Sequence, residues 1–279
     1  MQPSHSTGTH ETDDGLGLFE QEWSPAGATK AGVVIVHGFG EHSGRYVHVA
    51  EELTRNGYAV STFDLRGHGQ SQGEPRAFVR SFDEHLDDLG HFLSHVRQRH
   101  PGLPLFLFGH SMGGTIAALF AIARGPEIRG LLLSGPSLKL SDKYSPSLIR
   151  LAKILSIVFP KLRLLKLDAG AVSRDPEVVE NYVSDPLVYH GGVPARTGAE
   201  LNRAMERIRQ RMEVLRLPLL IMHGTDDLLA DPEGSRQLYE RAESGDKALR
   251  LYEGLYHEIL NEPERAQVLS DMIEWLDAH

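Results

Sequence analysis

The fold of this chain is decided by residues 105–114, which read LFLFGHSMGG. The apolar run before Gly109 has the length of a buried strand, and the Ala-rich residues 115–121 predict a helix packed against a sheet. Between them lies a G-x-S-x-G motif, in which Ser111 is flanked by Gly109 and Gly113. A strand that turns directly into a helix lifts the serine hydroxyl clear of the sheet and points amides at a developing oxyanion. The segment therefore predicts that Ser111 is a catalytic nucleophile.

The same glycines have two alternative interpretations, a strand–helix turn without chemistry and a phosphate-binding loop. A phosphate loop of the G-x-x-x-x-G-K-[ST] type requires a lysine, and no lysine follows Gly114. The order of strand, turn and helix favours the nucleophile.

Apolar strand-like runs alternate with helix-like runs along most of the chain. This alternation predicts an α/β fold with a mainly parallel central sheet that is covered by helices on both faces. Residues 15–23 predict a strand pair with a turn at residues 13–15, whereas the polar residues 1–10 predict a mobile start. The other expected strands cover residues 31–37, 58–63, 105–108, 130–134, 218–224 and 250–252, and the clearest helices cover residues 43–56, 81–99 and 263–279.

The alternation lapses after residue 136 and resumes after residue 194. This lapse predicts a cap of residues 137–195, inserted between two parts of one core, residues 1–136 and 196–279. Within the cap, residues 147–159 are apolar nearly all round, but a helix of about 20 Å is too short to span a bilayer of about 30 Å. The alternatives are a helix buried against the core and a lid helix that rests on lipid and admits an acyl chain. Both hold if one face lines the acyl tunnel, and we favour the lid.

The composition argues against several classes of protein. The chain has 279 residues, of which 41% are hydrophobic and 24% are charged, as expected of a globular α/β domain. A formal net charge of -9 argues against nucleic-acid binding, and the absence of cysteine excludes disulfides. The start resembles no signal peptide, and no apolar run approaches the ~20 residues of a membrane span. We therefore expect a cytoplasmic protein whose membrane contact, if any, is peripheral.

A serine hydroxyl needs a general base, and that base needs an acid to hold it. In α/β-hydrolases, which carry the G-x-S-x-G turn, the acid and then the histidine follow the serine on loops after later strands. His257 is the only histidine in the loop after residues 250–252, which makes it the candidate base. The strand that ends at Gly224 is followed by Asp226 and Asp227, and chain order alone does not choose between these two carboxylates.

The expected oxyanion hole combines two backbone amides. One is the amide of Met112, the residue after the nucleophile, and the other comes from a loop after an early strand. Residues 37–40, HGFG, supply that loop, and Phe39 is the favoured donor.

Several further stretches give the chain a resemblance to the monoacylglycerol lipases, especially bacterial ones, within the serine α/β-hydrolases that also include lysophospholipases. The likeness covers nearly the whole chain after the first ten or so residues. It implies an α/β-hydrolase fold with an inserted helical cap, and it places the acid at Asp227. It is carried by residues 37–46, 64–71, 109–114, 173–177, 184–187, 223–227 and 254–257, which read HGFGEHSGRY, DLRGHGQS, GHSMGG, SRDPE, SDPL, HGTDD and GLYH.

The resemblance also bears on the polar end of the substrate. Mammalian members hold the glycerol near the arginine that matches Arg45 and by cap residues around the tyrosine that matches Tyr182. It therefore implies substrate contacts for Arg45 and Tyr182, with Glu177 as a nearby carboxylate. Two positions depart from the family pattern. Val178 stands at the family's acidic position, and Leu260 stands where those members carry a second histidine.

The expected reaction is hydrolysis of monoacylglycerol to glycerol and a fatty acid through an acyl-enzyme on Ser111, without a metal or an organic cofactor. The expected partners are the lipid substrate and, through the cap, a membrane or lipid surface, but no nucleic acid. The alternatives with the same chemistry are a lysophospholipase or a broad carboxylesterase, with a serine peptidase less favoured. The alternative from another class is a non-catalytic protein of the same fold that binds an apolar ligand.

Two other polar pairs receive structural roles. His91 and His95 lie four apart on the expected helix 81–99, roughly opposite its apolar face, and predict solvated side chains rather than a metal site. Asp64 ends a strand and predicts a turn-stabilising pair with Arg66.

Overall fold

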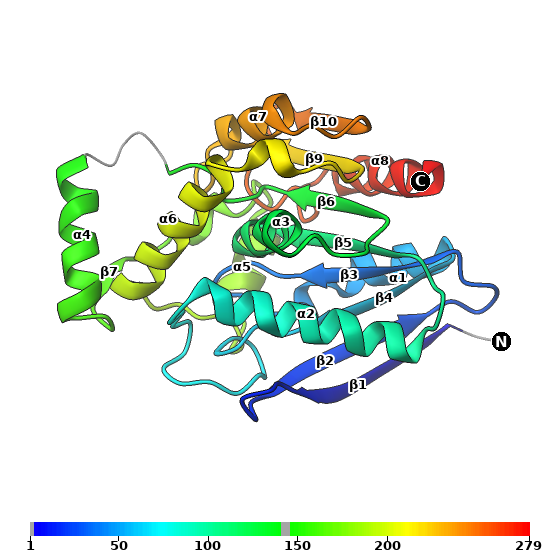
Figure 1. Cartoon of the computed structure of the whole chain (residues 1–279), viewed down its shortest axis with the longest axis horizontal. Coiled ribbons are helices and arrows are strands. Elements are labelled where there is room, and N and C mark those ends of the chain that lie inside the picture. Colours follow the sequence, from blue (N-terminus) through cyan, green and yellow to red (C-terminus); the bar gives the residue numbers. More distant parts are fainter. Residues whose placement is uncertain (1–2, 141–145) are drawn as a thin grey trace.

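An eight-stranded sheet forms the centre of the molecule (Figure 1). The computed structural model describes residues 3–140 and 146–279, without the side chains of residues 146–149 and 151. The strand order is β1-β2-β4-β3-β5-β6-β9-β10. The strands span Ser4–Glu11 (β1), Gly17–Ser24 (β2), Ala31–Val36 (β3), Tyr58–Phe63 (β4), Leu105–His110 (β5), Gly130–Ser134 (β6), Leu219–Gly224 (β9) and Lys247–Tyr252 (β10).

The six strands from β4 to β10 run parallel to one another, and β2 runs antiparallel to both of its neighbours, β1 and β4. The prediction of a mainly parallel sheet is therefore confirmed. Every residue of β3, β4, β5 and β9 is buried. This agrees with their mainly apolar sequences, because a parallel sheet with helices on both faces has no solvent-facing side.

Helices cover both faces of the sheet and enclose two separate cores. Strand β3 contributes to both, since Val33 and Ile35 point into one core and Val34 and Val36 into the other. The core of Val33 and Ile35 is covered by two helices, α1 (Val47–Arg55) and α8 (Arg265–Ala278). The opposite core is covered by α2 (Phe82–Arg99), α3 (Met112–Arg124), α6 (Ala195–Arg209) and α7 (Pro232–Arg241).

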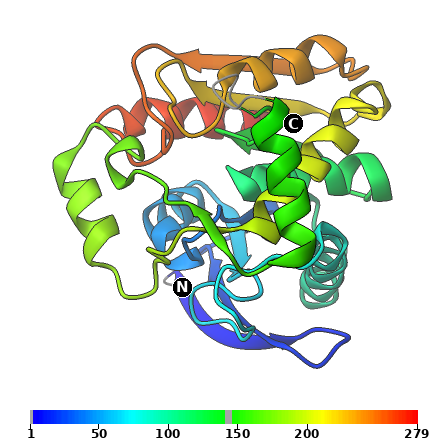
Figure 2. The same ribbon diagram turned by 90° about the vertical axis from the view of Figure 1, so that its left-hand side faces the viewer.

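Between β6 and α6 the chain leaves the sheet and forms small elements beyond the carboxyl ends of the parallel strands (Figures 1 and 2). α4 lies farthest from the sheet and packs against α6. β7 and β8 pair antiparallel beside it. The helix expected at residues 147–159 agrees with α4, and the cap boundaries at residues 137 and 195 stay predictions. These elements are α4 (Pro146–Val158), β7 (Arg163–Leu165), η2 (Ala169–Ala171), α5 (Pro176–Ser184) and β8 (Val193–Pro194).

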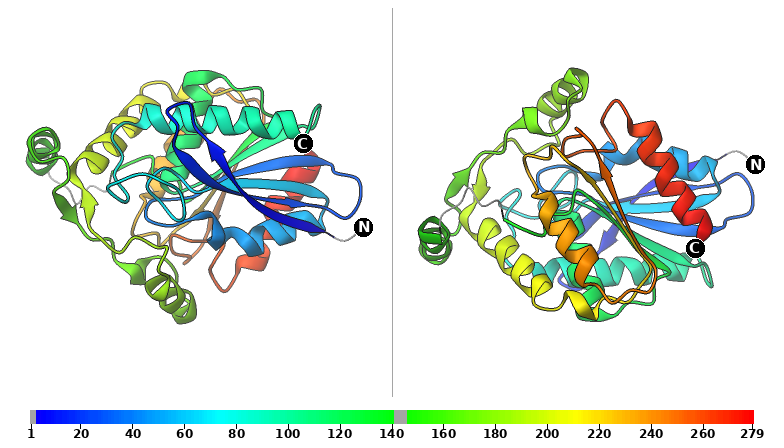
Figure 3. Two further views of the ribbon diagram at one scale, coloured as in Figure 1. Left: turned by 90° about the horizontal axis from the view of Figure 1, so that it is seen from below. Right: turned by 90° about the horizontal axis from the view of Figure 1, so that it is seen from above.

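The N-terminal residues form an edge hairpin rather than the mobile start that their polarity predicts (Figure 3). β1 pairs with β2 along its whole length, from Ser4 opposite Ser24 to Glu11 opposite Gly17. An edge strand leaves most of its side chains in solvent, so a polar sequence is compatible with it. The prediction of a mobile start is therefore wrong for the described part of this segment.

The same hairpin changes the surroundings of the two histidines on α2. His91 is partly exposed, with its Nε2 3.1 Å from a carboxylate oxygen of Asp13. The Nε2 atom of His95, in contrast, is buried and lies 3.3 Å from Glu20 of β2. The His95 side chain is 32% exposed, so the predicted solvated position is wrong only for its Nε2 atom, which the hairpin covers.

The parallel strands bring distant parts of the sequence to one side of the sheet. Phe39 follows β3, Ser111 follows β5, Asp227 follows β9 and His257 follows β10. In open α/β sheets this carboxyl-end edge is where ligands bind. Among the helices of the described residues, none is long and apolar enough to cross a membrane.

Candidate active site

Ser111 is the single residue that connects the end of β5 to the start of α3, and it forms a sharp turn there. Its backbone has φ 52° and ψ -120°, a conformation that is rare for any residue with a side chain. Hydrogen bonds fix the turn on both sides. The Ser111 amide donates to the Ser134 carbonyl at 3.0 Å, and the Ser111 carbonyl accepts from the amides of Thr115 and Ser137, each at 3.1 Å. Strain of this kind persists only where the surroundings impose it, and it is typical of functional residues.

The two glycines of the motif are required by close backbone contacts. A Cβ on Gly109 would lie 2.5 Å from the Gly113 carbonyl oxygen, and a Cβ on Gly113 would collide with the carbonyl oxygens of Val36 and His37. Gly113 therefore lets α3 start directly against the end of β3. This packing brings the serine beside the loop that contains Phe39.

Asp227 and His257 form a buried pair. Nδ1 of His257 donates to Oδ2 of Asp227 at 2.6 Å. The other oxygen of Asp227 accepts from the amides of Leu229 and Ala230, at 2.8 and 2.9 Å. Asp226 is exposed and its side chain bonds only to Thr225 among the described residues. The carboxylate beside the histidine is thus the second of the two aspartates.

The pair shifts the pKa of each partner. Burial raises the pKa of Asp227, but the His257 charge and the hydrogen bonds from His223 and His257 outweigh burial and hold it well below its usual value. Burial lowers the pKa of His257, but the Asp227 carboxylate outweighs it and raises the pKa above 6.5. Asp227 is therefore ionised at neutral pH and stabilises a proton on His257.

His223 is a partner of Asp227 that the sequence did not reveal. Its Nε2 donates to Oδ2 of Asp227 at 3.0 Å, and its Nδ1 lies 2.7 Å from the Ser235 hydroxyl. The ring is fully buried at the end of β9. In the sequence, His223 is marked only by its position four residues before Asp227, and this spacing does not predict the contact.

Ser111 and His257 face the same cavity, which has a volume of about 110 Å³. Phe39 and Met112 also line it, so both expected oxyanion donors lie at the cavity that contains the serine. Met112 is the first residue of α3, where a backbone N–H has no acceptor within its own helix.

A second cavity of about 500 Å³ extends under the small elements beyond the sheet. It shares four lining residues with the serine cavity, namely Phe39, Leu167, Asp168 and Tyr182. The site therefore continues from the serine toward the segment that the sequence predicts as a cap.

The loop of Phe39 is held by a glutamate. Oε1 of Glu41 accepts from the Gly38 amide at 2.6 Å and from the Tyr46 hydroxyl at 2.7 Å. On its other side, the Leu65 amide donates to Nε2 of His37 at 2.8 Å. Burial lowers the pKa of His37 to about 4, so the ring stays neutral and remains an acceptor.

Arg45 is bound to acidic side chains. It makes two hydrogen bonds to Glu258, at 2.5 and 2.7 Å, and one to Glu41 at 3.1 Å, while its guanidinium lies 4.8 Å from the centre of the Tyr182 ring. Its side chain is only 11% exposed and that of Glu258 is 6% exposed. The sequence did not single out Glu258, although it directly follows His257.

The two cap residues implied by the resemblance differ in position. Tyr182 lines both cavities. Glu177 is exposed in the first turn of α5 and lines neither cavity. Leu260, at the position that departs from the family pattern, is buried in the core beside α8.

The predicted pair of Asp64 with Arg66 is wrong. The Asp64 carboxylate accepts from the amides of Ser43 and Gln70, each at 2.7 Å, because the 64–71 turn closes over it. Arg66 points away and pairs with Asp88 of α2 at 2.6 Å.

Comparison with known proteins gives consistent matches. A family model described as serine aminopeptidase, S33, matches residues 27–264. The monoacylglycerol lipase of Mycolicibacterium smegmatis is 40% identical over 265 residues, which cover 95% of this chain and 94% of that protein. The monoglyceride lipase of Rattus norvegicus is 39% identical over 267 residues, 94% of this chain and 88% of that protein. The crystal structure of the Paleococcus ferrophilus monoacylglycerol lipase has a TM-score of 0.85 at 35% identity, covering 94% of this chain and 99% of that one.

Proposed function

The chain belongs to the monoacylglycerol lipase family of the serine α/β-hydrolases, and from this we propose that it hydrolyses monoacylglycerols to glycerol and a free fatty acid. The observation that carries the proposal is the His257–Asp227 pair at 2.6 Å, which faces the cavity of a serine held in a strained turn. A buried carboxylate that orients a histidine beside a serine is the arrangement used for acyl transfer.

In the proposed mechanism, the Ser111 oxygen attacks the ester carbonyl while its proton passes to His257. Asp227 holds the imidazole in orientation and stabilises the imidazolium that forms. The tetrahedral intermediate collapses, and His257 returns the proton to the glycerol oxygen as the ester bond breaks. Water then attacks the acyl-enzyme by the same route and releases the fatty acid. These steps need no metal or organic cofactor.

We assign the oxyanion hole to the backbone amides of Phe39 and Met112. Charge develops on the carbonyl oxygen in the tetrahedral state, and fixed amides stabilise it without reorganisation. The Glu41 bond to the Gly38 amide supports this assignment, because it holds the loop one residue before the Phe39 donor.

For the polar end of the substrate, we propose contact with Tyr182, which lines both cavities. Arg45 supports Tyr182 from behind through the guanidinium–ring contact, while its hydrogen-bonding groups are engaged by Glu258 and Glu41. Glu177 is left out of the substrate site because of its exposed position on α5.

We also propose that the cap segment contacts lipid. Apolar side chains lie on the outside of α4 and in the segment that follows it, where Ile157 is 75% exposed and Phe159 is 59% exposed. Exposed apolar side chains that gather on one part of a surface mark interaction sites. The large exposed hydrophobic residues of this segment are Ile154, Ile157, Val158, Phe159, Leu162, Leu164 and Leu165.

A hydrolysis panel tests the proposed activity. The purified chain is assayed on mono-, di- and triacylglycerols, lysophospholipids, short esters and a peptide amide, with Ser111→Ala as the control. We expect monoacylglycerol to have the highest kcat/KM, and loss of the nucleophile to lower turnover by about a millionfold. A preference for lysophospholipid or short esters would select an alternative substrate. Substantial activity in Ser111→Ala would overturn the mechanism.

A further inference from the structure

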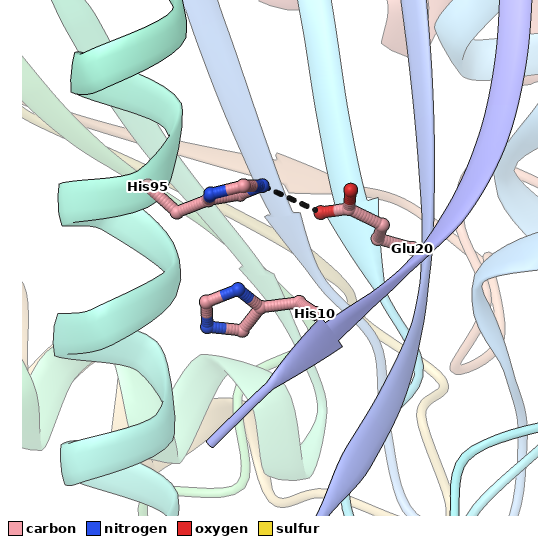
Figure 4. Close-up of side chains that lie close together, drawn as sticks. All are labelled: His10, Glu20 and His95. Atoms are coloured by element: carbon pink, nitrogen blue, oxygen red, sulfur yellow. Dashed lines mark ion pairs between the residues drawn. The ribbon is translucent and has the colours of Figure 1, made fainter. Parts of the chain in front are cut away.

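Three side chains that can bind a metal lie close together near the β1 edge of the sheet. The catalytic residues follow other strands, farther along the sheet. His10 comes from β1, Glu20 from the neighbouring β2, and His95 from α2 (Figure 4). One ligand atom from each lies within 4.8 Å of the others, and the His95 Nε2 to Glu20 Oε2 distance is 3.3 Å. Within residues 3–140 and 146–279, this is the one group of three such side chains close enough to hold a metal ion.

Each side chain of the cluster has a buried polar atom that makes no hydrogen bond within the described part of the chain. Nε2 of His10, Oε2 of Glu20 and Nε2 of His95 have no hydrogen-bond partner among the described residues. The Glu20 side chain is only 10% exposed. Buried polar atoms are nearly always hydrogen-bonded in folded proteins, so a cluster in which the 3.3 Å contact of His95 with Glu20 is the one polar contact of these atoms with described residues has room for a ligand.

Neighbouring groups leave these atoms free for that ligand. Arg99 donates to the other carboxylate oxygen of Glu20 at 3.0 Å, which neutralises part of its charge, while Oε2 faces His95. His91, one turn before His95 on α2, is engaged by Asp13. Phe92 contacts both the His10 and His95 rings and gives the cluster an apolar side.

We propose that His10, Glu20 and His95 form a binding site for one zinc ion. Two imidazoles and one carboxylate are a known ligand set for zinc, with the fourth position left to water. Bonds of about 2.0–2.2 Å in a tetrahedron place ligand atoms roughly 3.4 Å apart. The His95–Glu20 pair already has that separation, so binding requires mainly that His10 move inward with the edge strand β1.

The site has its ligands on two separate parts of the chain, because His10 and Glu20 belong to the N-terminal hairpin and His95 belongs to α2. Zinc would fasten the N-terminal hairpin onto α2. In the sheet, β2, β4 and β3 lie between the edge strand β1 and β5, the strand that precedes Ser111. The metal site is therefore separate from the catalytic residues. The inference does not depend on the proposed lipase activity.

Zinc titration of the untagged chain after chelator treatment tests the proposal. We expect saturable binding of one ion per chain, measured by calorimetry, and a rise in Tm of several degrees when zinc is in excess, since an ion that binds only the folded chain stabilises it. Co²⁺ in place of zinc should give the visible absorption of a tetrahedral site.

Variants locate the binding. His10→Ala and His95→Ala should each weaken zinc affinity at least tenfold and remove the Tm rise, whereas the matched control His91→Ala should retain both. Glu20→Gln, which keeps the side-chain shape, provides a further test if an alanine variant does not fold, and circular dichroism without metal checks the fold of each. Absence of one-to-one binding, or binding that persists in both histidine variants, would overturn the site.

Discussion

At the scale of single residues, Asp227 is distinguished by the number of its hydrogen bonds. Each of its oxygens accepts two, from His257 and His223 on one side and from Leu229 and Ala230 on the other. The carboxylate is therefore fixed in position as well as ionised, and it can hold the imidazole of His257 in one orientation.

Replacement of the two neighbouring aspartates should have unequal effects. We expect Asp227→Asn to lower kcat by about 10⁴-fold, since an amide does not stabilise the imidazolium and favours the wrong tautomer. The matched control Asp226→Asn removes an exposed carboxylate and should leave kcat within a few fold. Steady-state kinetics on a soluble short-chain ester measure both. The reverse ranking would assign the acid to Asp226.

The raised pKa of His257 determines the acid side of the activity profile. Only the neutral ring accepts the serine proton, so kcat/KM should fall as pH decreases through the pKa of the free enzyme. Because Asp227 raises that pKa, we expect the midpoint to lie above 6.5. It should move down in Asp227→Asn, where the charge that raises it is gone. A wild-type midpoint below 6.5 on a non-ionising ester would contradict this assignment.

Arg45 and Glu258 form a buried ion pair whose disruption should be costly. Arg45→Met leaves Glu258 and Glu41 without a countercharge, and we expect a loss of about 3–5 kcal/mol in the free energy of unfolding. The double variant Arg45→Met/Glu258→Gln, which removes the unpaired charge, should recover part of it. Urea unfolding measures all three proteins, and equal stability of wild type and Arg45→Met would show that the pair contributes nothing.

The same pair has a predictable pH dependence. Burial raises the pKa of Glu258, but Arg45 outweighs burial and lowers it. A lowered folded-state pKa stabilises the protein above the unfolded-state pKa, and this stabilisation is lost as pH falls through the folded value. The difference between wild type and Arg45→Met should therefore be largest at neutral pH and smaller in acid.

At the scale of elements, the described side chains of α4 expose apolar Ile154, Ile157 and Val158 beside charged Arg150 and Lys153, while the polar Ser156 is buried. Ile154 and Ile157 are 54% and 75% exposed, whereas Ser156 is buried. Burial of this surface in lipid would contribute about 25 cal/mol per Å² to membrane binding.

Acidic residues on α4 test its contact with lipid. Ile154→Asp/Ile157→Asp should weaken liposome binding and hydrolysis of aggregated long-chain substrate, with a soluble short ester and Tm unchanged because both positions are exposed. Val214→Asp, at an exposed apolar residue outside the cap, serves as the control. If both activities and Tm fall together, the helix is buried in solution and the lid proposal fails.

At the scale of the whole molecule, the sheet and the position of the site were predictable because each depends on a local pattern. Mainly apolar runs correspond to β3, β4, β5 and β9, which are buried on both faces. The glycines around Ser111 predicted the turn, because a strand–helix turn without side-chain space needs them. The order of these elements was then enough to place His257 and an aspartate at one edge.

The sequence did not reveal contacts between side chains that lie far apart in the chain. Glu258 meets Arg45 across 213 positions, and no local pattern connects the two. The strand of residues 4–11 was missed because its solvent-facing polarity is also the composition of a mobile tail. His10 and His95 were not connected for the same reason, since their proximity exists only once the hairpin closes on α2.

The order of strands around the segment predicted as a cap has an evolutionary consequence. β6 and β9 are neighbours in the sheet, although every element from α4 to the short helix η3 (Met212–Val214) lies between them in the sequence. The chain thus departs from the sheet after β6 and rejoins it on the adjacent β9. The part of the intervening segment that precedes α6, a helix that covers the core, can therefore drift in length and composition without altering any strand pairing. Recombination that exchanged this segment between relatives would transplant a substrate entrance while the catalytic loops stayed on an unchanged scaffold. Because the strand pairings do not depend on this segment, it is also a suitable place to graft another sequence in enzyme engineering.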